Sequence, residues 1–206
     1  MTRILLIRHG QTAWNEDCGE RLRGRAEIDL DDTGIAQAEA TARRLADWPL
    51  AAVYSSPLKR AMLTASILAQ PHGLSVQPDH GLIDIDYGKW QGLSIPEAEA
   101  DDRDLYHRWL NSPQTVTFPQ GEGLEQVRGR VVGALERLAA LHPDQAIALV
   151  SHKVACKVLV CSLLGLDTSH FWQVQQDLCA ISIFEAHEDG FAVVRINDTC
   201  HLEGLA

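Results

Sequence analysis

The sequence lacks several features of membrane and nucleic-acid-binding proteins. Its longest apolar stretch, at 158–166, is far shorter than the ~18 residues of a membrane-spanning helix, and the apolar run at 4–7 is too short for a signal-peptide core. Its 18 basic residues are outnumbered by 28 acidic ones, for a net charge of −10. This balance argues against non-specific binding to nucleic acids or anionic membranes. A small anion remains a suitable ligand if positive charge is concentrated in a pocket.

Paired cysteines and metal-binding histidine spacings are also missing. The five cysteines are odd in number and contain no C-x-x-C pair, so we expect free thiols in a reducing, cytoplasmic compartment. No two of the nine histidines have the short spacings that are typical of zinc ligands. The residues therefore predict a soluble, cytoplasmic protein without a metal site. The cysteines are Cys18, Cys156, Cys161, Cys179 and Cys200.

Three short apolar runs are typical of buried strands, and a helical pattern follows each of them. The runs and their helices cover, in order, 4–7 and 33–46, 51–54 and 58–70, and 146–150 and 153–164. Asp32 or Thr33 is the expected cap of the first helix. Strands that alternate with helices predict a parallel sheet covered on both faces.

The rest of the chain is less regular. Residues 82–86 alternate apolar and acidic side chains, helical patterns cover 102–110 and 123–141, and two late strands are expected at 181–186 and 191–196. No repeat, linker or change in composition divides the chain. We therefore predict one domain over residues 1–206, with three α/β/α layers and a mostly parallel central sheet.

Reactive side chains follow each of the three buried runs. Arg8 and His9 follow the first, Arg60 lies just beyond the second, and His152 follows the third. Ligands of open α/β sheets bind at the carboxyl ends of the strands, so these side chains are expected around one crevice. Arginines suit a phosphate dianion, and an imidazole can attack phosphorus as a nucleophile. Asp84, or alternatively Asp86, is a candidate donor of the proton that the leaving oxygen needs.

Four stretches in order resemble the histidine phosphatase superfamily, in its phosphoglycerate-mutase-like branch. The stretches are LIRHGQTAWN at 6–15, SSPLKRA at 55–61, GKWQG at 88–92 and VSH at 150–152. The resemblance extends from about Arg3 to about Leu202. It implies an α/β/α fold in which a helical insertion, here at 95–120, covers the site.

The resemblance also implies roles for the reactive residues. His9 matches the nucleophile that becomes phosphohistidine, and Arg8, Arg60 and His152 match the phosphate clamp. Asp84 stands where the family usually has a glutamate proton donor. The shorter side chain changes the reach of the donor. The resemblance implies neither a metal ion nor a cofactor.

A second set of residues is expected to border the substrate. Asn15 matches a pocket residue that orients phosphate, and Arg23 and Gly24 lie where the first loop of the family approaches substrate. Lys153 stands where glycine is common and either adds charge to the pocket or only begins a helix. The remaining candidates are Gly10 and Thr12 in the first motif, and Trp90 and Trp109 as possible borders of the substrate.

The substrate itself stays open at this stage. The later half of the chain is most similar to metal-independent phosphoserine phosphatases, but Tyr87 departs from the histidine associated with phosphoserine-specific members. We expect hydrolysis of a small phosphorylated metabolite, because mutases typically have a longer insertion after the proton donor. Mutase-type transfer and a non-catalytic phosphate-binding role are the alternatives. A homodimer is one expected oligomeric state, because dimers are common among similar proteins.

Overall fold

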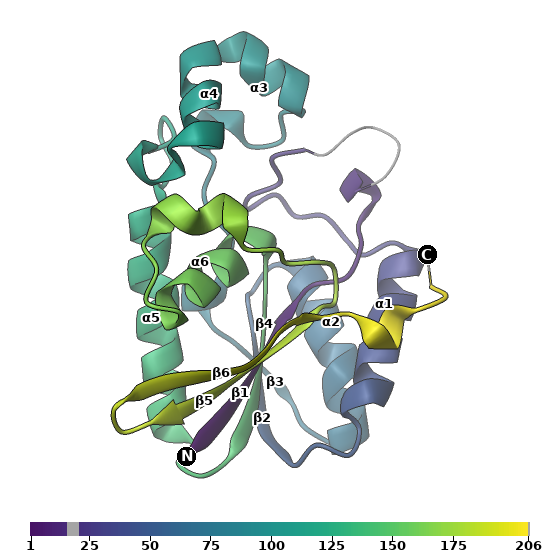
Figure 1. Ribbon diagram of the computed structural model, residues 1–206. Helices are drawn as coiled ribbons and strands as arrows, with labels where there is room; N and C mark the ends of the chain where they lie inside the picture. The colour runs from purple at the N-terminus through teal and green to yellow at the C-terminus, as the bar shows by residue number, and fades with distance from the viewer. Residues whose placement is uncertain (16–20, 206) are drawn as a thin grey trace.

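The computed structural model describes residues 1–15 and 21–205, and its centre is a six-stranded sheet (Figure 1). The strand order is β3-β2-β4-β1-β5-β6. The first four strands of the chain are parallel to one another, β5 is antiparallel to β1, and β6 is antiparallel to β5. The strands are β1 (Thr2–Arg8), β2 (Leu50–Ser55), β3 (Val76–Pro78), β4 (Ala146–Ser151), β5 (Ile181–His187) and β6 (Gly190–Asp198). The mostly parallel sheet is as predicted, apart from β3, which the sequence pattern did not indicate.

Helices cover both faces of this sheet, which confirms the three-layer prediction. Figure 1 shows α1 (Asp32–Leu45) and α2 (Lys59–Ala69) on one side, and α5 (Leu124–Leu141) and α6 (Lys153–Leu163) on the other. The cap of α1 is Asp31, whose carboxylate accepts a hydrogen bond from the Gly34 N–H. The expectation of Asp32 or Thr33 at that position is therefore wrong by one or two residues.

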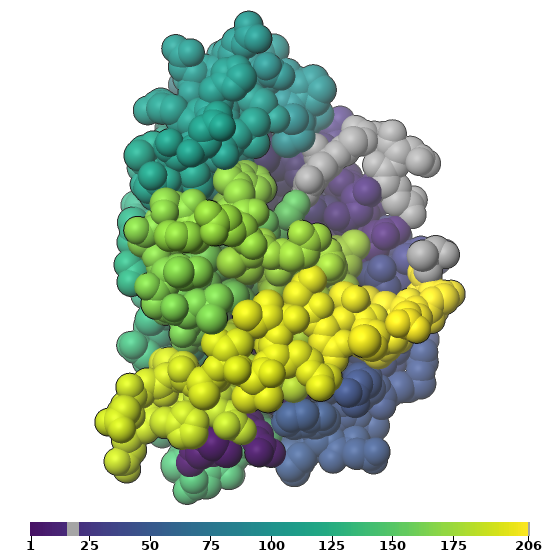
Figure 2. Space-filling view, in the orientation of Figure 1, coloured from purple at the N-terminus to yellow at the C-terminus, as the bar shows by residue number. Residues whose placement is uncertain are grey.

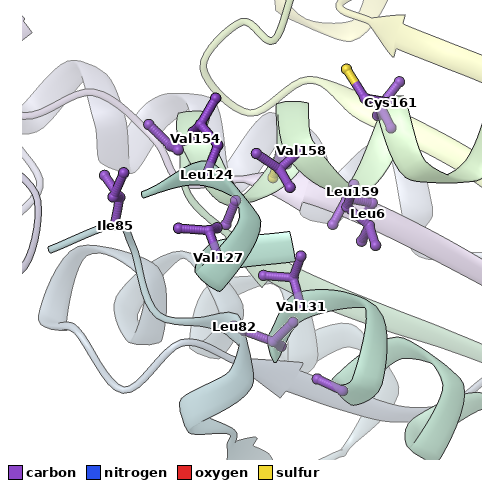
Figure 3. Close-up of a cluster of buried hydrophobic side chains, with 14 of the residues drawn as sticks. Leu6, Leu82, Ile85, Leu124, Val127, Val131, Val154, Val158, Leu159 and Cys161 are labelled. Carbon is purple, nitrogen blue, oxygen red and sulfur yellow. The ribbon is translucent and has the colours of Figure 1, made fainter. Parts of the chain in front are cut away.

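Side chains of the buried strands point alternately to the two faces of the sheet, and they form two separate cores. Ile4 and Leu6 pack towards α5 and α6, whereas Leu5 and Ile7 pack towards α2. Figure 3 shows the first of these clusters, in which apolar residues of both helices meet Leu6. Because strand side chains point alternately to opposite faces, an unbroken apolar run is what a sheet buried on both sides requires.

Two short helices, α3 (Ile95–Asp101) and α4 (Arg103–Asn111), form a lobe beyond the carboxyl ends of the parallel strands (Figures 1 and 2). The sequence predicted only one helix here, over 102–110. The Ser94 hydroxyl caps α3, with Glu97 completing a capping box, so that Pro96 lies in the first turn rather than interrupting the structure. The Asp102 carboxylate then caps α4. The predicted insertion is confirmed, and it contains one helix more than expected.

Two further expectations concern apolar helices and thiols. Among the described residues, no helix is both long and apolar enough to cross a membrane. Cys156, Cys161, Cys179 and Cys200 are free thiols, as predicted. Cys18 lies outside the described residues.

Candidate active site

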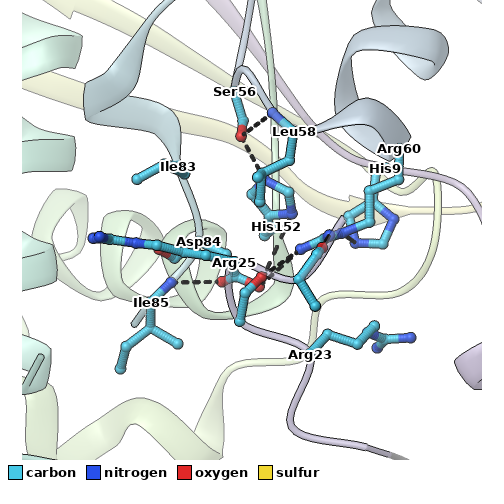
Figure 4. A network of polar contacts seen from close by, with 12 residues as sticks. His9, Arg23, Arg25, Ser56, Leu58, Arg60, Ile83, Asp84, Ile85 and His152 are labelled. Atoms are coloured by element: carbon cyan, nitrogen blue, oxygen red, sulfur yellow. Dashed lines mark hydrogen bonds and ion pairs between the residues drawn. The ribbon is translucent and has the colours of Figure 1, made fainter. Parts of the chain in front are cut away.

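The parallel register brings three chain segments to one edge of the sheet. Arg8, the last residue of β1, is level with Ser151 of β4, and Ser55 of β2 is level with Val150. The residues that follow these strand ends therefore meet, and Figure 4 shows His9, Arg60 and His152 close together. The crevice predicted from the strand ends is formed by these residues.

His9 has a defined tautomer. Its Nδ1 lies 2.6 Å from the carbonyl oxygen of Gly10, and because a carbonyl only accepts, Nδ1 carries the proton. The lone pair is therefore on Nε2, where it accepts a hydrogen bond of 3.3 Å from Arg60 Nε. Burial, assisted by the positive charge of Arg60, holds the pKa of His9 well below its usual value. The ring is neutral at pH 7 and can act as a nucleophile through Nε2.

Arg60 is fully buried and links His9 to the carboxyl group of Asp84. Its Nη1 and Nη2 each donate a 2.7 Å hydrogen bond, to the carbonyls of Ala26 and Gly24 respectively. Nη2 also lies 3.5 Å from Asp84 Oδ2. The backbone carbonyls fix the plane of the guanidinium, and Gly24 has the left-handed φ of 46° that favours glycine. Arg60 is thus held in place before any ligand binds.

His152 is buried beside His9, with the two ring centroids 5.1 Å apart. Its Nε2 lies 2.7 Å from the Ser56 hydroxyl, and its Nδ1 is 3.9 Å from Asp84 Oδ2. Burial is the largest cause that holds the pKa of His152 well below its usual value, and the charge of Arg60 is the next. This second imidazole is therefore also neutral at pH 7.

Ser56 selects the tautomer of His152, and sequence reasoning did not single it out. Its Oγ already accepts a hydrogen bond from the Leu58 N–H (Figure 4). The hydroxyl is buried, so its own proton is best satisfied by donation to His152 Nε2. The proton of His152 is then on Nδ1, on the side of Asp84. The second serine of the S-S-P stretch is the only sequence signal of this role.

Asp84 is buried between the clamp and a neighbouring cavity. Its Oδ1 accepts a 3.0 Å hydrogen bond from the Ile85 N–H, and its Oδ2 faces Arg60 and His152. Burial raises the pKa of Asp84, and the nearby charge of Arg60 only partly opposes this. A raised pKa favours the protonated form that a general acid requires. Asp86 pairs instead with Arg25, at 3.3 Å.

Arg130 holds the segment that carries Asp84, and it too was missed at the level of sequence. From α5 it donates hydrogen bonds to the carbonyls of Ile83 and Asp84, and its guanidinium pairs with Glu122 at 3.0 Å. Arg130 lies next to the apolar stripe of its helix, beside Val131. An arginine placed so near a buried stripe is a usable signal, because such a charge needs internal partners.

Comparisons with known proteins agree with this geometry. A family model described as the histidine phosphatase superfamily (branch 1) matches residues 4–199. The chain is 36% identical over 202 residues to phosphoserine phosphatase 1 of Hydrogenobacter thermophilus, covering 98% of this chain and 95% of the relative. The chain belongs to branch 1 of the histidine phosphatase superfamily. The resemblance inferred from the four motifs is confirmed, and the protein is a phosphatase.

Two further similarities place this histidine phosphatase among its relatives. It is 27% identical over 208 residues to a probable phosphoglycerate mutase, GpmB, of Yersinia pestis, covering 98% of this chain and 96% of the relative. Among solved structures, YhfR of Bacillus stearothermophilus superposes with a TM-score of 0.94 at 26% identity, covering 98% and 100% of the two chains. The fold predicted from sequence is therefore shared along the whole of that structure.

The predicted substrate-border residues of this phosphatase form a hydrogen-bonded chain. Arg23 Nη1 donates to the Thr12 hydroxyl at 3.2 Å, and that hydroxyl donates to Asn15 Oδ1 at 3.0 Å. Arg23 is buried, and its charge contributes to the lowered pKa values of His9 and His152. Arg23 therefore belongs to the same electrostatic cluster as the clamp.

Other predicted residues lie around this cluster with different contacts. Arg8 Nη1 donates to the carbonyl of Gln176, and Arg8, Asn15 and Lys153 together line a hollow of about 480 Å³. Gly10 serves packing, because a Cβ there would lie 2.5 Å from the carbonyl oxygen of Gly34. Lys153 begins α6 and lines the hollow, so both of its suggested roles are compatible with the structure.

A second cavity, of about 260 Å³, is lined in part by Asp84. Trp109 lines this cavity, as expected for a residue that borders substrate. Trp90 does not, because it is fully buried and its indole N–H donates to Asp101 Oδ2 at 2.9 Å. The suggestion that Trp90 borders the substrate is therefore wrong. Because its ring has no exposed face, Trp90 packs in the core and does not line a binding site.

Proposed function

We propose that this phosphatase hydrolyses a small phosphorylated metabolite through a phosphohistidine at His9, without a metal ion. One observation carries the proposal: Arg60 lies within 3.3 Å of His9 Nε2 and 3.5 Å of Asp84 Oδ2. A nucleophile, a fixed cation and a proton donor therefore surround one point. These are the groups that transfer of a phosphoryl group to nitrogen requires.

In the first step, the lone pair of His9 Nε2 attacks phosphorus while the bond from phosphorus to the ester oxygen breaks. The leaving oxygen takes the proton of Asp84, so that a neutral alcohol departs. Arg8, Arg60 and the Nδ1–H of His152 stabilise the negative charge on the phosphoryl oxygens. The raised pKa of Asp84 supplies the proton at a pH where an exposed aspartate would be ionised.

In the second step, water hydrolyses the phosphohistidine. Asp84, now a carboxylate, accepts a proton from water as the water oxygen bonds to phosphorus. The bond between phosphorus and Nε2 breaks, and its electron pair returns to His9. Inorganic phosphate leaves, and Asp84 is again protonated. The cycle needs no oxidant and no second substrate other than water.

One relative supports the hydrolysis of this class of substrate, and another supports the alternative of mutase-type transfer. Phosphoserine phosphatase 1 supports hydrolysis of a small phosphomonoester. The relative named as a probable phosphoglycerate mutase favours transfer between positions of one substrate as the second candidate. Incubation with 3-phosphoglycerate separates the two, because a hydrolase releases inorganic phosphate and a mutase produces 2-phosphoglycerate.

Trapping of the covalent intermediate tests the proposal. The enzyme is mixed with p-nitrophenyl phosphate carrying a radioactive phosphoryl group and is denatured at alkaline pH, where phosphohistidine survives. We expect stoichiometric label on His9, no label in His9→Ala, and full label in the control His187→Ala, which alters an exposed histidine of β5. A chelator is expected to leave the rate unchanged. Full turnover by His9→Ala, or absence of label across many phosphomonoesters, contradicts the proposal.

A further inference from the structure

We propose that the preferred substrate has an aromatic or otherwise apolar alcohol as its leaving group, rather than an amino acid. This inference rests on the proposed function, because it assumes that Asp84 protonates the leaving oxygen. That oxygen must lie beside the Asp84 carboxyl group. The carbon skeleton attached to it then occupies the cavity of about 260 Å³ that Asp84 lines.

The wall of this cavity is mostly apolar and aromatic. Apart from charged residues and Gly24, the lining consists of Leu22, Tyr87, Ile95, Tyr106, Trp109, Leu110, Val154, Phe171 and Trp172. A cavity of about 150 Å³ with apolar walls is already sufficient to bind benzene. The space beside Asp84 therefore has room for a ring, and its walls match a ring in polarity.

The aromatic part of the wall is rigid before a ligand binds. The ring of Trp109 lies 5.2 Å from that of Phe171 and 5.4 Å from that of Trp172, between centroids. The indole N–H of Trp172 donates to the Trp109 carbonyl at 2.7 Å. The Lys157 ammonium lies 4.9 Å from the centroids of both Phe171 and Trp172. Rigid walls reduce the entropy lost on binding, which favours a ligand that fills the space.

The charges around the cavity disfavour an ammonium group on the leaving alcohol, which is part of an amino-acid skeleton. The charged lining residues are Arg21, Arg23, Lys153 and Asp84, so Asp84 is the only carboxyl group among the described residues of the wall. An ammonium group on the substrate would face three cations. Its only acidic partner would be Asp84, which must be protonated for the first step. Unfavourable charge contacts of this kind lead to discrimination between substrates.

Three alkyl phosphates test the inference without a large difference in leaving-group chemistry: 3-phenylpropyl phosphate, propyl phosphate and phosphoserine. We expect kcat/KM for 3-phenylpropyl phosphate to exceed those for the other two by about 10- to 100-fold. If phosphoserine is hydrolysed as well as or better than the phenylpropyl ester, the inference is wrong while the proposed function stands. If none of the three is hydrolysed and no phosphoenzyme forms, the proposed function itself fails.

A pair of exposed leucines provides variants that are expected to fold. Leu110 lines the cavity and is 42% exposed, whereas Leu141 is 61% exposed at the end of α5 and lies outside the cavity. Leu110→Asn is expected to lower the ratio of kcat/KM values for phenylpropyl and propyl phosphate by about threefold or more, because it replaces an apolar contact. Leu141→Asn is expected to leave the ratio unchanged. Equal ratios in both variants contradict the assignment of this cavity to the leaving group.

Discussion

The cluster of Arg8, His9, Arg60 and His152, here called the phosphate centre, and the cavity beside it are built in different ways. The centre lies at the carboxyl edge of the sheet, and backbone carbonyls hold its charged and polar groups, as for Arg60 and His9. Much of the aromatic part of the cavity wall, including Trp109 and Phe171, comes from α4 and from the short helical segment at Thr168–Gln173, outside the sheet. The groups that we propose for phosphoryl transfer are therefore held at the edge of the sheet. Trp109, Phe171 and Trp172, which we propose to contact the alcohol, are on segments that can vary without disturbing that chemistry.

Asp84 lies between the two regions. Its substitution is expected to cause the largest loss of rate, and the size of that loss should depend on the leaving alcohol. Asp84→Asn removes the transferable proton, so we expect alkyl phosphates to be hydrolysed about 10²- to 10⁴-fold more slowly. The effect on p-nitrophenyl phosphate is expected to be much smaller, because p-nitrophenolate leaves without a proton. Steady-state rates for both substrates measure this difference.

Asp86→Asn is the matched control for that experiment. Asp86 is two residues away and pairs with Arg25, but it does not line the cavity. We expect this variant to slow both substrates to a similar, small extent. If Asp86→Asn shows the leaving-group dependence and Asp84→Asn does not, the alternative donor considered from the sequence is correct.

Within the phosphate centre, Arg60→Lys tests whether geometry matters beyond charge. Lysine keeps the positive charge but cannot donate simultaneously to Ala26, Gly24 and His9. We expect kcat/KM to fall by about 10²- to 10³-fold for aryl and alkyl phosphates alike, because the clamp acts on the phosphoryl group. Arg103→Lys, at an exposed arginine of α4, is the control and is expected to retain full activity. A full rate in Arg60→Lys would show that charge alone is sufficient.

The two regions also differ in how far the sequence predicted them. His9, Arg60 and His152 follow buried apolar runs, and parallel strands place such positions at one edge, so the local pattern was sufficient to predict that these three side chains lie together. The cavity wall depends on tertiary packing between α4 and residues 168–173, which lie far apart in the sequence. Among the aromatic residues of the wall, the sequence singled out Trp109 as a border of the substrate and Tyr87 through its departure from the resemblance, but it indicated neither Phe171 nor Trp172 as part of the wall.

Smaller discrepancies have equally local causes. Pro96 interrupts an apolar pattern in the sequence, but it stands in the first turn of α3, where proline is compatible with a helix. The strand Val76–Pro78 has only three residues, too few for periodicity to detect. Ser56 and Arg130 act through hydrogen bonds to His152 and to backbone carbonyls, and no spacing rule identifies such contacts.

The electrostatics of the phosphate centre predict a pH-dependent stability. The folded pKa values of His9 and His152 are lowered, so below pH ~6.5 the unfolded chain binds more protons than the folded one. The free energy of unfolding should therefore decrease as pH falls from about 6.5, by up to ~2.7 kcal/mol per pH unit for two such groups. Asp84, with its raised pKa, has the opposite dependence, since it stabilises the folded state only at low pH. Urea denaturation between about pH 7.5 and pH 5.5 measures the net slope.

Two variants distinguish the contribution of the buried histidines to this slope from that of exposed histidines. His152→Gln removes one titrating group and is expected to reduce the slope by about half. His107→Gln, at an exposed position on α4, is the matched control for this substitution. A slope that is the same in the wild type and in His152→Gln would mean that His152 is protonated in the folded state, contrary to its burial beside Arg60.

Ser56→Ala is expected to have a smaller effect than Asp84→Asn or Arg60→Lys, and it tests how His152 is oriented. Without the hydroxyl, no side chain donates a hydrogen bond to His152 Nε2, so nothing keeps the proton of the ring on Nδ1 and the ring samples both tautomers. Only the Nδ1–H form donates towards the phosphoryl oxygens, so we expect kcat to fall about 5- to 10-fold with little change in KM. Ser56→Thr keeps a hydroxyl at the same position and is expected to restore most of the activity. If threonine restores nothing while alanine is as stable as the wild type, the loss arises from packing, and Ser56 does not control the tautomer.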